Sequence, residues 1–272
     1  MITTMLQGGL GNQMFQYAHG LAQARRLGVE LQLDTGLLDN DGLRQYNLDL
    51  FSGVDEAITK GSKANVIERG LPYDESLYYH VKDGDVLRGY WQCEDYFGGL
   101  VPLLFAKFKP KAGIPSNMQY LVDDIKSSPS STFLTIRRTD YIKKQEFHGV
   151  LPIEYYREAL GLIHSKTGIA PRVFVFSDDP QWCKESLYLN YPFVLAGSFD
   201  QTTPTHLGRE DIDMYLMSLC RHAVMANSSF SWWGAWLGDF TRQPRVVIGP
   251  SQWFTSSAVD SRDIIPERWI RL

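Results

Sequence analysis

The chain opens with MITTMLQGGLGNQMFQYAHGLAQARRLGVELQLD, residues 1–34, and the pattern of this segment predicts the fold class. An apolar run of strand length comes first, and a glycine-rich turn separates it from Met14, Tyr17 and Leu21, which recur at helical spacing. Gly28 is a favourable residue for ending that helix, because glycine adopts the left-handed conformation at little cost. The segment ELQLD then predicts a second strand, so the chain begins with a β-α-β unit.

A second alternating series follows in the other half of the chain. The apolar segments TFLTI and RVFVF predict strands, and the segments AVMA and RVVIG predict two more. Strands that alternate with helices are typical of α/β proteins with parallel sheets. The apolar spacing predicts helices over 153–166, 180–189 and 209–221.

The segment KSSPSS at 126–131 separates the two series and has the composition of a linker. We therefore expect two domains, 1–128 and 129–272. Two β/α domains in tandem favour a ligand site in the cleft between them.

The composition excludes several classes of protein. With 272 residues, 44% hydrophobic and 21% charged, the chain is neither disordered nor fibrous. Its 27 basic and 31 acidic residues give a formal net charge of -4, so no overall positive field would attract nucleic acid. The three cysteines lie far apart, which indicates neither a disulfide framework nor a zinc site. No apolar stretch approaches the roughly 18 residues of a membrane span, and no signal peptide precedes the first strand, so we expect a cytoplasmic protein.

The first candidate site is the turn between the first strand and the first helix, where backbone amides and a helix N-terminus can bind an anion. It matches part of a dinucleotide-binding fingerprint, since Asp34 ends the next strand, but Met14 occupies the position of the third glycine. The alternative is a tight turn with Asn12 as the helix N-cap. The candidate residues of this turn are Gly9, Gly11, Asn12 and Gln13.

The second candidate is the pair Arg137 and Arg138, directly after the strand TFLTI. The carboxyl ends of parallel strands form the edge where open α/β sheets bind ligands. Two permanently charged guanidiniums at that edge suit a pyrophosphate, because each can form paired hydrogen bonds with phosphate oxygens. The alternative is a pair of surface arginines that form an ion pair with Asp140.

The third and fourth candidates follow two later strands. In FSDDP, Asp179 is expected to cap a helix that begins at Pro180, and Asp178 could then accept hydrogen bonds from N1 and N2 of a guanine. The alternative is that Asp178 only complements the helix dipole. In ANSSFSWWGAW, the polar turn at a helix start can bind phosphate, and we expect the tryptophans to pack in the core. The candidate residues of this turn are Asn227, Ser228, Ser229 and Phe230.

Asp211 and Asp213 spell the D-x-D pattern of metal-dependent sugar transferases, but no apolar strand precedes them. They are instead expected to open a helix and to complement its dipole. The six histidines show no metal-ligand spacing. We therefore expect no metal site.

Taken together, these stretches resemble the α-1,2-fucosyltransferases of glycosyltransferase family 11. The matching segments are GGLGNQMFQYAHGLA, RRTDYI, FHGVLPIEYY, FSDDPQWC, DMYLMSLCRHAVMANSSFSWWGAWL and VIGPSQWF. The resemblance implies a GT-B fold, with two Rossmann-like domains that face a central cleft. It also implies GDP-β-L-fucose as the donor, inversion to an α-linkage, and neither a metal nor another cofactor.

The resemblance also implies roles for individual residues. Arg137 and Arg138 match the arginines that bind the donor pyrophosphate, and Asp178 matches the acid that recognises guanine. Ser228, Ser229 and Phe230 match the phosphate-side loop, whereas the N-terminal turn matches a loop that enters the cleft from the other domain. Thr135 stands where the family motif has histidine, so we expect a changed donor contact.

An inverting displacement also needs a base for the acceptor hydroxyl. The candidates that follow the arginines are Asp140, Glu146 and His148, and the fixed motif position favours Asp140.

Two other functions compete with the transferase interpretation. A nicotinamide-dependent oxidoreductase would use the opening β-α-β unit and Asp34, but it gives the arginine pair no role. A non-catalytic carbohydrate-binding protein would use the 13% aromatic residues, but it needs no phosphate loop.

Unlike anchored animal relatives, this chain starts almost at its first strand, which favours a bacterial cytoplasmic enzyme. Its acceptor would be a galactose-terminated oligosaccharide or lipid-linked glycan of a surface polysaccharide (O-antigen), with peripheral association at the inner membrane. In this interpretation 1–128 is the acceptor-side domain and 129–272 binds GDP-fucose.

Overall fold

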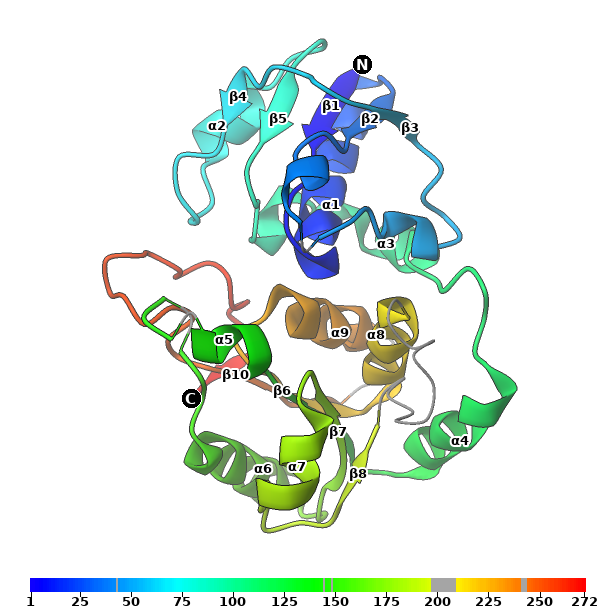
Figure 1. Cartoon of the computed structure of the whole chain (residues 1–272), viewed down its shortest axis with the longest axis vertical. Coiled ribbons are helices and arrows are strands. Elements are labelled where there is room, and N and C mark those ends of the chain that lie inside the picture. The colour runs from blue at the N-terminus through cyan, green and yellow to red at the C-terminus, as the bar shows by residue number, and fades with distance from the viewer. Residues whose placement is uncertain (43, 144, 148, 197–208, 241–243) are drawn as a thin grey trace. The chain divides into compact units, whose positions relative to one another are not determined.

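The computed structural model describes residues 1–42, 44–143, 145–147, 149–196, 209–240 and 244–272. The chain forms two compact α/β units (Figure 1). Unit 1 contains residues 1–112 and 259–266, and unit 2 contains residues 113–258 and 267–272.

The division between the units differs from the boundary expected at 128/129. Helix α4 (Gln119–Ser127) packs against helix α8 (Glu210–Leu219), so it belongs to unit 2. The buried face of α4 carries Leu121, Val122 and Ile125. The serine-rich segment 126–131 therefore lies inside unit 2, between α4 and the first strand of its sheet.

Unit 1 has a five-stranded parallel sheet in the order β3-β2-β1-β5-β4. Helix α1 (Leu10–Leu27) lies against β1, where a side chain on Gly20 would come within 2.9 Å of Leu31 and 3.1 Å of Thr4. Gly28 ends α1 with a φ of 68°. The strands are β1 (Ile2–Met5), β2 (Leu31–Asp34), β3 (Ala57–Thr59), β4 (Val66–Ile67) and β5 (Val86–Arg88), and the short helices are α2 (Glu75–His80) and α3 (Val101–Lys107).

Unit 2 has a six-stranded parallel sheet in the order β11-β10-β9-β6-β7-β8. Numbered from the first strand of this unit, the order is 3-2-1-4-5-6 read from the β8 side, which is the arrangement of the dinucleotide-binding Rossmann fold. The direction of winding reverses between β6 and β9. The strands are β6 (Ser131–Ile136), β7 (Arg172–Ser177), β8 (Phe193–Leu195), β9 (His222–Val224), β10 (Val247–Gly249) and β11 (Ile270–Arg271).

Helices cover both faces of this sheet (Figure 1). On one face, α6 (Ile153–Thr167) and α7 (Pro180–Ser186) share a buried core with β6 and β7. On the opposite face, α8 packs against α9 (Ser229–Asp239). A short helix, α5 (Thr139–Lys143), follows β6 closely.

Most elements expected from the sequence are confirmed, and one cap is wrong. Asp179 caps α7 by accepting a hydrogen bond from Trp182 N at 3.1 Å, and Asp211 and Asp213 lie in the first turn of α8. Asn12 is not the N-cap of α1, because the helix begins at Leu10 with Gly9 as its N-cap. The tryptophans of α9 are fully buried, as expected; they are Trp232, Trp233 and Trp236.

A buried charge cluster fixes the last residues of unit 2. Asp239, at the end of α9, accepts hydrogen bonds from Arg268 Nε at 2.9 Å and Trp269 Nε1 at 2.7 Å. It also forms an ion pair with Arg245 Nε at 3.5 Å, and the Arg245 side chain is only 1% exposed. A carboxylate at a helix C-terminus is opposed by the helix dipole, so these donors must outweigh that repulsion.

We predict that Asp239→Asn lowers the free energy of unfolding by about 3 kcal/mol or more, because the buried Arg245 charge loses its counter-charge. Urea unfolding measures this change. The matched control is Asp260→Asn, which removes an exposed ion pair with Arg262 and should leave stability almost unchanged, because solvent screens that pair. Equal effects of the two substitutions would contradict the structural role of Asp239.

Candidate functional site

The candidate site in unit 2 lies where the strand order reverses. The segment after β6 carries Arg137 and Arg138, and the segment after the neighbouring strand β9 carries Asn227. Thr135 joins these strands, because its buried hydroxyl accepts a hydrogen bond from Ala226 N at 2.8 Å. The threonine that replaces the motif histidine therefore acts as a brace between the two strands, and its hydroxyl hydrogen is still available as a donor.

Asp178 organises the segment 137–139, which we call the arginine loop. Its carboxylate accepts hydrogen bonds from the backbone N of Arg138 at 2.9 Å and of Thr139 at 3.3 Å. It also accepts one from the Thr139 hydroxyl at 2.8 Å and lies 3.5 Å from Arg137 Nε. Asp178 thus fixes the backbone of the loop that the two arginines share.

The same contacts bear on the expected recognition of guanine. Within the described part of the chain, Asp178 Oδ2 accepts hydrogen bonds from the backbone N–H and the hydroxyl of Thr139, whereas Oδ1 accepts one, from the Arg138 N–H. A carboxylate oxygen offers about two acceptor positions. Recognition of guanine by both oxygens therefore requires the Thr139 hydroxyl to turn away, and the guanine-reading role stays a prediction.

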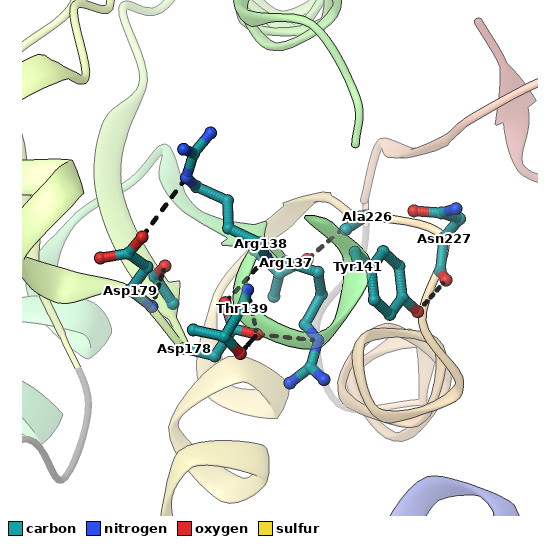
Figure 2. Close-up of polar contacts among 10 residues, drawn as sticks. Arg137, Arg138, Thr139, Tyr141, Asp178, Asp179, Ala226 and Asn227 are labelled. Atoms are coloured by element: carbon teal, nitrogen blue, oxygen red, sulfur yellow. Dashed lines mark hydrogen bonds and ion pairs between the residues drawn. The ribbon is translucent and has the colours of Figure 1, made fainter. Parts of the chain in front are cut away.

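Figure 2 shows that the side chains of Arg137 and Arg138 point in opposite directions. Arg138 lies over the Trp182 ring, with its guanidinium carbon 3.9 Å from the ring centroid, and its Nε is 3.4 Å from Asp179 Oδ2. The guanidinium carbon of Arg137 is 5.4 Å from the centroid of the Tyr141 ring. The two guanidiniums therefore do not converge on one point as a pair would.

Sequence reasoning missed two aromatic residues that hold this arrangement. Tyr141 donates a hydrogen bond from its hydroxyl to Asn227 O at 2.8 Å, which links α5 to the end of β9 (Figure 2). Trp182 supports the guanidinium of Arg138 through a cation–π contact. The signal in the sequence is the position of each aromatic residue. Tyr141 lies four residues after Arg137, and Trp182 lies one helical turn after Asp179.

The N-terminus of α9 carries the last group of candidate residues in unit 2. Its N-cap, Ser228, makes no side-chain hydrogen bond to the helix, so this end carries uncapped backbone amides. Asn227 is buried, and its Nδ2 donates to Trp253 O at 3.0 Å, which holds the turn before the helix. The first residues of the helix, Ser229 and Phe230, are partly exposed. A helix start of this kind favours a phosphate oxygen.

The candidates near the N-terminus lie in unit 1. Gly8 has a φ of 76°, and a side chain there would come within 2.5 Å of Asn12 Nδ2. Gln13 is buried, and its Nε2 donates to the carbonyl oxygens of Gly8 at 2.9 Å and Gln45 at 2.8 Å. The turn that contains Gly9 and Gly11 is thereby tied to the segment after β2.

Asp34 does not have the surroundings of a ribose-binding acid. It is fully buried, and its two oxygens accept hydrogen bonds from Gly36 N at 2.8 Å and Ser62 N at 2.6 Å. Burial alone would raise the pKa of Asp34, but the hydrogen bonds from Ser62, Gly36 and Gly61 outweigh it and hold the pKa below its usual value. Asp34, which favoured a nicotinamide-dependent oxidoreductase, therefore holds the loops after β2 and β3 in place.

The structure places only part of the expected general-base candidates. Glu146 is exposed, and its carbonyl oxygen accepts a hydrogen bond from the Thr255 hydroxyl. Asp140 lies in α5, but its side chain is outside the described part of the chain, as is the whole of His148. Among the residues that the structure describes, no three His, Cys, Asp or Glu side chains gather as metal ligands do. None of the described helices has the length and apolar character needed to cross a bilayer.

Comparison with known proteins identifies the family. Residues 84–272 match the model of glycosyl transferase family 11. The chain is also 31% identical to an α-1,2-colitosyltransferase of Escherichia coli, in an alignment that covers 100% of this chain and 99% of that protein. The chain belongs to glycosyl transferase family 11.

Further comparisons agree with this family 11 membership. The O-antigen biosynthesis glycosyltransferase WbnK of Escherichia coli is 29% identical over 98% of this chain and 99% of its own length. The crystal structure of NodZ, an α-1,6-fucosyltransferase soaked with GDP-fucose, superposes with a TM-score of 0.51 at 15% identity, over 87% of this chain and 92% of NodZ. The α/β fold of GT-B type, with two Rossmann-like units, is confirmed.

We predict that Asp178→Asn increases the hydrogen-exchange rate of the Arg138 and Thr139 amides by at least about tenfold. The reason is that a hydrogen bond to a charged group contributes ~1.5 kcal/mol or more. The matched control is Asp179→Asn, which should accelerate exchange of the Trp182 amide and leave exchange of the Arg138 and Thr139 amides unchanged, because Asp179 contacts Arg138 through the guanidinium and not through its backbone. Slow exchange of the loop amides in Asp178→Asn would show that another group holds the loop.

Proposed function

We propose that this family 11 glycosyltransferase transfers L-fucose from GDP-β-L-fucose to the 2-hydroxyl of a terminal β-galactose, with inversion to an α-linkage. The single observation that carries the proposal is the arginine loop, which is fixed by Asp178 beside the uncapped start of α9. This arrangement sits at the reversal of strand order in a Rossmann sheet, where open α/β sheets bind nucleotides.

The arginine loop and the α9 start can supply the charge stabilisation that the reaction needs. As the bond between the anomeric carbon and the phosphate oxygen breaks, negative charge accumulates on the departing GDP. A fixed guanidinium and backbone amides lower the energy of that charge without reorganising during the reaction. Because the two guanidiniums diverge, we infer that Arg137 and Arg138 contact different parts of the donor. The tyrosine and tryptophan rings beside them limit their motion.

The acceptor hydroxyl must lose a proton as it attacks the anomeric carbon. Asp140 remains our proposal for the base, because it lies on α5 directly after the arginine loop. Glu146 and His148 remain the alternatives. No other cofactor or metal takes part in this scheme.

The proposal extends to the acceptor and the setting. Unit 1 would bind the acceptor and unit 2 the GDP-fucose donor. The similarity to an O-antigen biosynthesis glycosyltransferase supports an acceptor from surface polysaccharide synthesis, which is a galactose-terminated oligosaccharide or a lipid-linked glycan. A lipid-linked acceptor would place a cytoplasmic enzyme peripherally at the inner membrane.

Transfer of a colitosyl group is the second candidate, because a relative of 31% identity over the whole chain is named for that activity. Colitose is L-fucose without its 3-hydroxyl, so the two donors differ at one position of the sugar and share the GDP group. The contacts of unit 2 described above concern the shared nucleotide part of the donor.

Calorimetric titration of the purified chain in EDTA with GDP, ADP and NADH tests the donor class. We predict binding of GDP alone, followed by transfer from GDP-fucose to lactose, a β-galactoside. Binding of NADH without GDP would favour the oxidoreductase, and transfer from GDP-colitose without transfer from GDP-fucose would favour the second candidate.

We predict that Arg137→Ala and Arg138→Ala each lower turnover by at least about tenfold, because one lost charge-assisted contact is worth ~1.5 kcal/mol or more. Initial rates with GDP-fucose and lactose measure the effect. The matched control is Arg172→Ala, at the opposite end of β7, where the arginine pairs with Asp124 at 2.7 Å. Wild-type rates in both arginine variants of the loop would refute the assignment.

A further inference from the structure

A second acid, Glu68, holds a loop at the carboxyl edge of the sheet in unit 1. Glu68 directly follows β4, which pairs with β5 so that Ile67 lies opposite Arg88. Its carboxylate oxygens accept hydrogen bonds from the backbone N of Tyr90 at 2.6 Å and of Trp91 at 2.9 Å. The side chain of Glu68 therefore crosses the end of β5 and fixes the segment that follows it.

Gly89 makes this crossing possible. A Cβ atom on Gly89 would lie 2.4 Å from Glu68 Cβ and 2.8 Å from its Oε2, which is closer than real atoms approach. The backbone next to it is strained, since Trp91 has a φ of 55° and is the one non-glycine residue with a positive φ in the described part of the chain. A bulky residue in this conformation costs about 1–3 kcal/mol and persists only where its surroundings enforce it.

The surroundings of Trp91 do enforce it. Its ring is fully buried, with its centroid 4.1 Å from that of His19 and 5.3 Å from that of Tyr96. Burial raises the pKa of Glu68 to about 7, and the two backbone hydrogen bonds offset only part of that rise. A buried acid thus lies beside a strained tryptophan, and backbone strain of this kind is typical of functional sites.

The held segment leads to the polar group at the reversal of strand order in unit 1. Gln92, next after Trp91, donates a hydrogen bond from Nε2 to Asn12 Oδ1 at 2.8 Å. Asn12 lies in the first turn of α1, so this bond joins the segments that follow β5 and β1, the two neighbouring strands where the order reverses. Tyr90, one residue before Trp91, is 39% exposed.

We propose that Glu68 is a positioning residue, which holds segment 89–92 so that Tyr90 and the Gln92–Asn12 amide pair bind the acceptor sugar at this edge. An exposed aromatic ring beside fixed amides suits a carbohydrate, because the ring packs on C–H groups and the amides bond hydroxyls. The inference rests on the proposed transfer to a β-galactoside, and it adds residues outside the arginine loop.

Steady-state kinetics of the full chain with GDP-fucose and lactose test the proposal. We expect Glu68→Gln to raise the KM for lactose at least tenfold. The side-chain NH₂ group of the glutamine would face the backbone N–H of Tyr90 or of Trp91, and two donors cannot form a hydrogen bond with each other. The Kd for GDP, measured by calorimetry, should stay within twofold of wild type. The matched control is Glu56→Gln, which changes a partly buried glutamate before β3, at the opposite edge of the same sheet. Glu56 bonds Tyr17 and Lys107, so its loss should lower stability and leave the KM for lactose unchanged.

Gln92→Ala provides a second variant that leaves the strained loop and its acid in place. It should also raise the KM for lactose, and the double variant with Glu68→Gln should raise the KM by less than the product of the two separate effects, since both changes act on segment 89–92. An unchanged KM in Glu68→Gln or Gln92→Ala, an equal rise in Glu56→Gln, or fully additive effects would each overturn the role of Glu68. Absence of transfer by the wild-type chain would overturn the proposed function and this inference with it.

Discussion

Backbone N–H groups beyond the ends of parallel strands need acceptors, and in this protein acidic side chains provide them. A buried amide without a partner costs as much free energy as a lost hydrogen bond, so the buried N–H groups that follow each strand need acceptors. Asp34 bonds the amides of Gly36 and Ser62, and Asp178 bonds those of Arg138 and Thr139. Asp34 ends β2 and fixes both the loop after its own strand and the loop after the neighbouring strand β3. Asp178 follows β7 and fixes the loop after the neighbouring strand β6. The loops to which we assign binding roles are therefore held by side chains at the ends of the sheet.

The balance between burial and hydrogen bonding differs among these acids. The hydrogen bonds to Asp34 outweigh the cost of burying its charge, and its pKa falls below the usual value. At Glu68 burial is the larger influence, and the pKa rises to about 7. An acid that accepts two backbone hydrogen bonds thus holds an unstrained loop at Asp34 and a loop that contains the strained Trp91 at Glu68. Strain of this kind is common where a protein must present side chains in one orientation.

The sequence predicts the elements better than the contacts between them. The segment TFLTI predicts strand β6 because it is a short, mainly apolar run, and all six residues of the strand are buried in the structure. The position of Arg137 and Arg138 directly after this strand follows from that prediction. The boundary between the units does not follow from the sequence in this way, because the attachment of α4 to α8 depends on a tertiary contact. The roles of Trp182 and Tyr141 depend on the direction in which each arginine side chain points. The spacing of residues in the sequence does not indicate that direction. The strand β4 has only two residues, too few for a pattern that would reveal Glu68 behind it.

The two units are interleaved along the chain, which has a consequence for synthesis on the ribosome. Residues 259–266 return to unit 1 before 267–272 complete unit 2. The edge strand β11 and two partners of Asp239, Arg268 and Trp269, lie after that return, whereas Arg245 precedes it. A nascent chain can therefore build the inner strands of the second sheet early, but Asp239 then has Arg245 and lacks Arg268 and Trp269 until the segment after 266 is synthesised. Completion of unit 2 therefore follows synthesis of the segment that returns to unit 1, an order set by the arrangement of segments along the chain.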